Sequence, residues 1–150
     1  VIGAVLNISG KGAVAAVIYR AVQAREGNYM VFFPSYRFLE DVYERFAGRT
    51  SGRPELESII QSPYMGEEQR EQFLEKFEEN RETTLIGFCV MGGIFSEGID
   101  LSRDKLIGAV IVGTGLPQVC NEREILKQFF DKRNMRGFDF AYLMHTDIRE

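Results

Sequence analysis

The sequence predicts a three-layer α/β/α domain built on a mostly parallel sheet. Continuous apolar runs, such as Tyr29–Phe33 and Leu106–Val112, are typical of strands that are buried on both faces. Stretches with apolar residues at intervals of three and four stand between such runs and predict amphipathic helices. The alternation of the two patterns indicates parallel strands joined by helices that cover both faces of the sheet.

The expected elements follow one another regularly along the chain. In order, we expect a helix over 12–25, a strand over 29–33, a helix over 36–46, a loop over 48–54, a short strand within 56–61, a helix over 67–80, strands over 83–90 and 106–112, and a helix over 122–133. Ser35 is placed to cap the helix that follows it, because its hydroxyl can accept a backbone N–H. The apolar stretch Val1–Ile8 lacks the basic region and the length of a signal peptide, so we expect it to be structured.

Aromatic and thiol side chains are expected in the core. Six phenylalanines fall on core positions of the predicted strands and helices: Phe32, Phe33, Phe38, Phe46, Phe73 and Phe77. Cys89 and Cys120 stand in apolar surroundings, and their spacing matches no zinc or disulfide framework. We therefore expect two buried thiols in a reducing, cytoplasmic protein.

Length and composition favour one ordinary globular domain. The 150 residues are 45% hydrophobic and 27% charged, and no apolar run reaches the roughly 20 residues of a membrane span. The net charge is -4, so no global positive field attracts nucleic acid. Any contact with nucleic acid must therefore be local, through backbone amides and a few side chains. We expect no membrane partner.

Two polar segments directly follow predicted strands. These are Pro34–Tyr36 and Gly92–Leu101. Ligands of parallel α/β sheets bind outside the carboxyl ends of the strands, so both segments are candidate binding loops. Tyr36 is the one aromatic residue near a strand end that we consider as a ligand contact rather than as core.

The second segment has the composition of a loop that serves two ligands. Its glycines, which allow close backbone approach and positive φ, are Gly92, Gly93 and Gly98. The Ser96 hydroxyl and amide could bind a phosphate oxygen, whereas the carboxylates of Glu97 and Asp100 suit hydroxyls or cationic groups. The same residues also fit a tight glycine turn with a capping carboxylate, and the residue types leave both interpretations open.

The two segments together resemble helicase motifs of the DinG/XPD group of superfamily 2. Residues 92–101, Gly-Gly-Ile-Phe-Ser-Glu-Gly-Ile-Asp-Leu, and the run 106–113 with Leu116-Pro117 are similar to motif V and the strand that follows it. Residues 29–36, Tyr-Met-Val-Phe-Phe-Pro-Ser-Tyr, are similar to motif IV. The resemblance extends from about Gly12 to Tyr142 and is closer to bacterial DinG-like proteins than to the eukaryotic repair helicase.

This resemblance implies a RecA-like domain that packs against a first RecA-like domain, with ATP between the two and single-stranded DNA across the top. Ser35 and Ser96 stand where the family contacts phosphates of the strand, and Asp100 where related motors hold the ribose hydroxyl. Glu97 belongs to the motif that couples nucleotide state to the hold on the strand. The implied strand-binding residues are Ser35, Tyr36, Gly92, Gly93 and Ser96, and the implied nucleotide-binding residues are Glu97, Gly98 and Asp100.

The chain departs from a complete motor in ways that predict an inactive fragment. Phosphoryl transfer requires a phosphate cradle and a metal carboxylate, and the sequence has neither. Ser9–Gly12 lacks the glycine spacing of a P-loop. Residues 1–150 are therefore expected to be one domain of a longer helicase, ending before motif VI. Catalytic residues, the main site for ATP with Mg, and any iron–sulfur cluster are expected in the absent first domain, and we expect no metal site in this chain.

Two other classes of protein remain as alternatives. A nucleotide-sugar glycosyltransferase half-domain also uses a Glu-Gly turn on a ribose, but it continues into a helix with a second Glu, whereas Ser102–Lys105 leads here into an apolar strand. A non-catalytic α/β binding module is the third interpretation. It predicts no response to nucleic acid or nucleotide.

Overall fold

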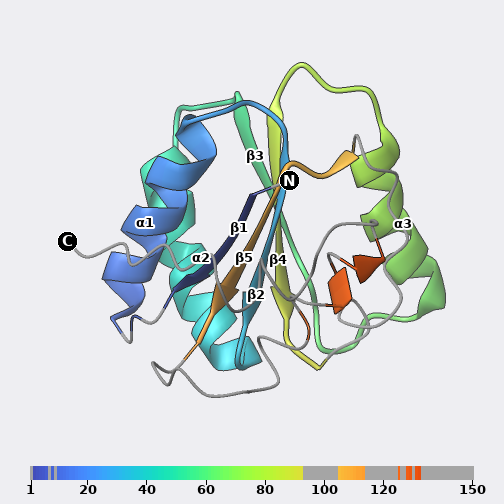
Figure 1. Ribbon diagram of the computed structural model, residues 1–150, viewed down its shortest axis with the longest axis horizontal. Helices are drawn as coiled ribbons and strands as arrows, with labels where there is room; N and C mark the ends of the chain where they lie inside the picture. The colour runs from blue at the N-terminus through green and yellow to red at the C-terminus, as the bar shows by residue number, and fades with distance from the viewer. Residues whose placement is uncertain are drawn as a thin grey trace.

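The described part of the chain forms a parallel sheet with strand order β1-β5-β2-β4-β3 (Figure 1). In this computed structural model the described residues are 2–6, 8, 10–92, 105–113, 125, 128, 129, 131 and 132. The elements are β1 (Ile2–Leu6), α1 (Lys11–Gln23), β2 (Asn28–Phe33), α2 (Tyr36–Thr50), β3 (Leu56–Ile60), α3 (Glu67–Glu78), β4 (Thr84–Val90) and β5 (Gly108–Val112). All four pairings between them are parallel, which confirms the predicted α/β architecture.

Helices cover both faces of the sheet, with α1 and α2 on one face and α3 on the other (Figure 1). Strand β2 shows why its sequence is apolar after its first residue, Asn28. Tyr29, Val31 and Phe33 belong to the core under α1 and α2, whereas Met30 and Phe32 belong to the core under α3. Successive side chains of a strand point to opposite faces, so a strand covered on both faces has no polar alternation.

Aromatic rings fill much of the core between the sheet and α2. The Phe33 and Phe88 rings stack with centroids 5.7 Å apart, and Tyr43 meets Phe88 edge to face at 5.3 Å. Five of the six phenylalanines predicted to be core are buried, and the sixth, Phe38, is partly buried and packs against the same cluster. The buried five are Phe32, Phe33, Phe46, Phe73 and Phe77.

Gly87 in the middle of β4 allows α3 to approach the sheet closely. A Cβ at this position would lie 2.6 Å from Cζ of Phe77 and 3.3 Å from Cζ of Phe73. The absence of a side chain is therefore what lets both rings lie directly on the strand. Phe129, from the last described stretch, is buried in the same cluster. Residues 125, 128, 129 and 131 are helical and residue 132 is in a turn, in agreement with the predicted helix over 122–133.

Most boundaries lie close to the sequence prediction, and the end of α2 differs most. The helix predicted to end at Phe46 continues to Thr50, so the first residues of the expected 48–54 loop are helical. Gly48 is tolerated there on an exposed face, and the Thr50 hydroxyl donates to the Phe46 carbonyl at 3.2 Å. The apolar start of the chain forms the edge strand β1, which pairs with β5 from Ile2 opposite Gly108 to Leu6 opposite Val112.

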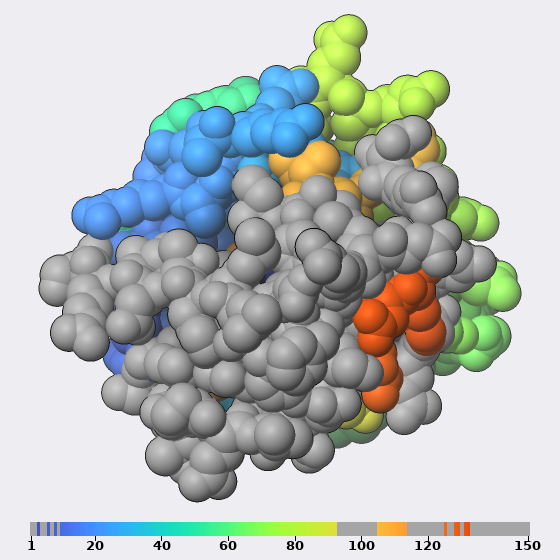
Figure 2. Space-filling view, in the orientation of Figure 1, coloured from blue at the N-terminus to red at the C-terminus, as the bar shows by residue number. Residues whose placement is uncertain are grey.

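The amino edge of the sheet is closed by polar contacts between connecting segments. The buried Asn28 amide donates to the carbonyls of Phe77, at 3.2 Å, and Lys105, at 2.8 Å. The Lys105 ammonium in turn donates to the Asn80 side chain at 3.3 Å. The segments leading into β2, β4 and β5 meet at the top of the molecule in Figure 2. Ligands of parallel α/β sheets bind at the opposite, carboxyl edge, where the two candidate segments begin.

None of the described helices is long and apolar enough to cross a membrane.

Candidate nucleic-acid and nucleotide site

The two candidate segments leave the sheet from adjacent central strands. Strands β2 and β4 pair in parallel, with Phe33 opposite Val90 at their carboxyl ends. The Met91 amide donates to the Phe33 carbonyl at 2.8 Å, so the ladder continues to the last residue of β2. Segments that are far apart in sequence, Pro34–Tyr36 and the residues from Gly92 onward, therefore start side by side at one edge.

Ser35 caps helix α2, as the sequence predicts. Its Oγ accepts a hydrogen bond from the Phe38 amide at 3.2 Å, and its extended backbone is typical of a cap. The hydroxyl is exposed and still carries a proton to donate and a second lone pair. It stands at the positive end of the dipole of a 15-residue helix, where an anion is favoured.

Tyr36, the first residue of α2, is held by a residue that the sequence analysis did not single out. The Gln61 Nε2 group donates to the Tyr36 hydroxyl at 3.1 Å, and the Gln61 Oε1 atom accepts from the Val90 amide at 2.9 Å. Gln61 follows the end of β3, is only 2% exposed, and donates its own amide to the Phe88 carbonyl at 2.8 Å. Burial raises the pKa of the Tyr36 phenol, which therefore stays protonated and able to donate a hydrogen bond at neutral pH.

Gly92 has the backbone conformation that the sequence analysis expects of this loop. Its φ is +73°, in the left-handed region, and a Cβ there would meet nothing within 4 Å. Glycine is thus needed at this position for its backbone conformation, not for space. The other residues proposed for this loop, Gly93, Ser96, Glu97, Gly98 and Asp100, lie outside the described residues.

A group of charged side chains lies where α1 and α2 begin, at the same edge. The Lys11 ammonium binds the Asp41 carboxylate and lies 5.7 Å from the centroid of the Phe38 ring. This hydrogen bond, with help from Arg37 and Arg45, lowers the pKa of Asp41 below its usual range. The charge of Lys11 is therefore paired inside the domain, whereas the Arg37 side chain, at the second position of α2, is exposed.

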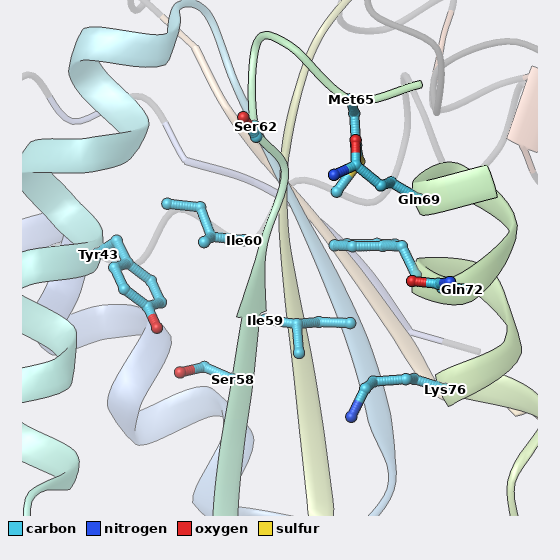
Figure 3. Close-up of a pocket in the computed structure, with 10 residues that line it drawn as sticks. Tyr43, Ser58, Ile59, Ile60, Ser62, Met65, Gln69, Gln72 and Lys76 are labelled. Carbon is cyan, nitrogen blue, oxygen red and sulfur yellow. The ribbon is translucent and has the colours of Figure 1, made fainter. Parts of the chain in front are cut away.

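A cavity of about 400 Å³ lies along the outer edge of the sheet, beside β3 (Figure 3). Tyr43 of α2 faces it from one side of β3, and Gln72 and Lys76 of α3 face it from the other. Ser62 stands at the end of the cavity nearest the carboxyl edge. None of the described residues proposed for the site lines this cavity, so it is distinct from the candidate site.

The described residues contain neither a reactive thiol nor a cluster of side chains that could hold a metal ion. Cys89 is fully buried, and burial raises the pKa of its thiol far above the usual range, so it is not a nucleophile. Within the described ranges, no three His, Cys, Asp or Glu side chains gather closely enough to hold a metal ion. Cys120 and His145 lie outside the described residues.

Comparisons with known proteins point to a family of helicase domains. The model of the helicase C-terminal domain family matches residues 18–148. A probable ATP-dependent helicase of Methanocaldococcus jannaschii is 27% identical over 135 residues, which cover 85% of this chain and 20% of that protein. The chain thus spans 20% of the length of this relative. Because the family match extends over most of its length, the chain belongs to the helicase C-terminal domain family.

Proposed function

We propose that this chain is the second motor domain of an ATP-dependent DNA helicase of the DinG/XPD type. Family membership supports a helicase domain, and the similarity of residues 29–36 and 92–101 to motifs IV and V supports this group within it. The observation that carries the proposal is the pairing of Phe33 with Val90. It brings the starts of the two motif-like segments to neighbouring strand ends at the carboxyl edge of the sheet.

In this proposal the carboxyl edge binds the phosphates of single-stranded DNA. Ser35 offers an exposed hydroxyl at the positive end of α2, and Ser96 offers a second hydroxyl from the other segment. Gly92 and Gly93 let the backbone come close to the strand, and Tyr36, which follows Ser35 at the start of α2, is proposed to contact the strand as well. These contacts involve phosphates rather than base edges, so binding is expected to be nearly independent of sequence.

The nucleotide is proposed to bind on the side of the loop that carries Glu97, Gly98 and Asp100. Asp100 accepts a hydrogen bond from the ribose hydroxyl, and Glu97 couples that contact to the strand. ATP with Mg is held mainly by a first RecA-like domain, to which any iron–sulfur cluster also belongs. A ribose hydrogen bond and some packing amount to a few kcal/mol, so the isolated domain is expected to bind ATP at best in the millimolar range and not to hydrolyse it.

The family match favours this proposal over a glycosyltransferase half-domain. A non-catalytic binding module differs from a motor domain in a simple way, because it responds to neither DNA nor nucleotide. The two interpretations are therefore separated by one binding experiment.

The test is an amide NMR titration of the isotopically labelled chain with a short single-stranded DNA at low salt. We expect shifts at Phe33–Tyr36 and Gly92–Gly98, and much smaller shifts at the amino edge around Asn28. The matched variant is Ser35→Asp, which keeps a helix cap but places a negative charge where the phosphate is proposed to bind. It is expected to bind the DNA more weakly. A folded spectrum that does not change with DNA, together with a full-length protein that also fails to bind DNA, contradicts the proposal.

A further inference from the structure

Tyr64 is a large side chain displayed to solvent at the proposed strand-binding edge. It lies in the connection from β3 to α3 and is 92% exposed, and no other large hydrophobic side chain of the described residues is exposed in this way. Strand β3 runs parallel to β4, with Ile60 opposite Phe88. The connection after β3 therefore leaves the sheet at the same edge as Ser35 and Gly92.

The loop that carries Tyr64 is fixed at both ends. On one side, Gln61 is buried and bonded to β4 through its backbone and its side chain. On the other side, Met65 packs against the core under α3. Between them, the Tyr64 amide donates to Ser62 Oγ at 3.4 Å and the Met65 amide donates to the Ser62 carbonyl at 3.3 Å. Pro63 restricts the backbone further.

A single exposed aromatic residue is common on protein surfaces, but Tyr64 combines three features that suit it to a ligand. Its backbone is held in place, so little entropy is lost when the ring is covered. The loop from Gln61 to Gly66 has no charged residue of its own; the carboxylates that follow it, Glu67 and Glu68, begin α3, and Glu67 pairs with Arg70. The loop begins at the end of β3, which lies next to the end of β4, and β4 in turn lies next to β2.

We propose that Tyr64 is a base-stacking residue that extends the single-strand path from the ends of β2 and β4 to the end of β3. This inference rests on the proposed function of the carboxyl edge. Ser35, and the loop after β4, hold phosphates, whereas the Tyr64 ring packs against the face of one base. Every base has such a face, so the contact adds affinity without adding sequence preference.

The experiment measures binding of fluorescent single-stranded oligonucleotides to the full-length protein and to its Tyr64→Ala and Tyr64→Phe variants. Loss of one stacked base predicts roughly tenfold weaker binding for Tyr64→Ala. Tyr64→Phe keeps the ring and is expected to bind within about twofold of the wild type. The dependence of affinity on salt should stay the same in both variants, because no phosphate contact is removed.

An oligonucleotide that carries abasic sites provides the decisive comparison. On this DNA the wild type and Tyr64→Ala are expected to bind equally, since there is no base for the ring to cover. Two outcomes overturn the inference and leave the proposed function intact. In the first, Tyr64→Ala binds normal DNA as tightly as the wild type does. In the second, Tyr64→Ala loses as much affinity for abasic DNA as it loses for normal DNA. If the wild type itself does not bind single-stranded DNA, the proposed function fails and the inference fails with it.

Discussion

The side-chain amide of Gln61 joins the phenol of Tyr36 to the backbone of Val90. It donates to the Tyr36 hydroxyl at 3.1 Å and accepts from the Val90 amide at 2.9 Å. One buried side chain thus fixes the start of α2 and the ends of β3 and β4 relative to one another. These are the positions from which the proposed DNA-binding segments emerge, so the geometry of the edge depends on a residue that need not touch the ligand.

We expect Gln61→Ala to destabilise the domain by about 1–3 kcal/mol, because the buried Val90 amide loses its partner. Tyr36→Phe should cost about 1 kcal/mol or less, since it removes only the phenol oxygen. Urea denaturation of the single and double variants measures both effects and their coupling. Gln72→Ala, in an exposed glutamine on α3, is the matched control and should stay within about 0.5 kcal/mol of the wild type. A Gln61→Ala variant as stable as this control contradicts the role of the amide.

Ser35 has two separable roles, as the cap of α2 and as a proposed phosphate contact. Ser35→Ala should lower the free energy of unfolding by about 1 kcal/mol, because the Phe38 amide loses its cap. Ser35→Asp keeps a cap and adds a favourable charge at the helix start, so we expect stability close to that of the wild type. Both variants should bind single-stranded DNA more weakly, Ser35→Asp most of all. If Ser35→Asp binds DNA as well as the wild type does, Ser35 is a structural cap only.

The fold was predictable because the central strands β2, β4 and β5 are apolar along almost their whole length. β2 and β4 are covered on both faces and carry a polar residue only at their first positions, Asn28 and Thr84. The helices between them show a regular apolar stripe. The end of α2 was harder to place. Gly48 favours a break, but tertiary packing of Phe46 and the Thr50 hydrogen bond carry the helix past it.

Gln61 was not predictable from the sequence, although Ser35 was. A serine just before a helical pattern has a local reason to be there, and its partner, Phe38, is three residues away. The partners of Gln61 are Tyr36 and Val90, which come close only when β2, β3 and β4 have assembled. A glutamine after a short strand has no local signature of burial, so only the assembled sheet reveals its role.

The two glycines Gly87 and Gly48 should respond in opposite ways to the same substitution. Gly87→Ala places a methyl group 2.6 Å from the Phe77 ring, and we expect a loss of about 1–3 kcal/mol of stability. Gly48 lies in α2 with nothing within 4 Å of a Cβ, so Gly48→Ala should stabilise the domain by about 0.5–1 kcal/mol. Thermal or urea unfolding checks both. A neutral Gly87→Ala variant would mean that α3 can move away from the sheet at little cost.

Asp100→Ala in the full-length protein tests the proposed nucleotide contact. We expect DNA-stimulated ATP turnover to fall, and the KM for ATP to rise, while affinity for single-stranded DNA changes much less. The lost ribose hydrogen bond predicts an effect of about 1 kcal/mol, or roughly fivefold, on nucleotide affinity. Asp104→Ala removes a nearby carboxylate outside the motif-like segment and serves as the matched control. Collapse of DNA binding with unchanged ATP turnover contradicts the assignment of Asp100 to the ribose.

Cys89 should make the stability of the domain depend on pH in the alkaline range. Burial raises the pKa of its thiol in the folded state, whereas the thiol of the unfolded chain ionises above about 8.5. The unfolded state then releases a proton that the folded state keeps, so stability falls as the pH rises. The expected loss is about 1.4 kcal/mol between pH 7 and pH 9.5.

Urea unfolding across this pH range, in a Cys120→Ser background so that only one thiol titrates, measures the Cys89 contribution. Cys89→Ala is expected to be less stable than its parent at pH 7, because it removes a buried sulfur atom. The decisive quantity is the difference in free energy of unfolding between Cys120→Ser and the same variant with Cys89→Ala. Contributions from other ionisable groups are shared by both and cancel in this difference. That difference should shrink by about 1.4 kcal/mol on going to pH 9.5. A difference that stays constant shows that the Cys89 thiol ionises as readily in the folded domain as in the unfolded chain, which requires water to reach the core between β4 and α3.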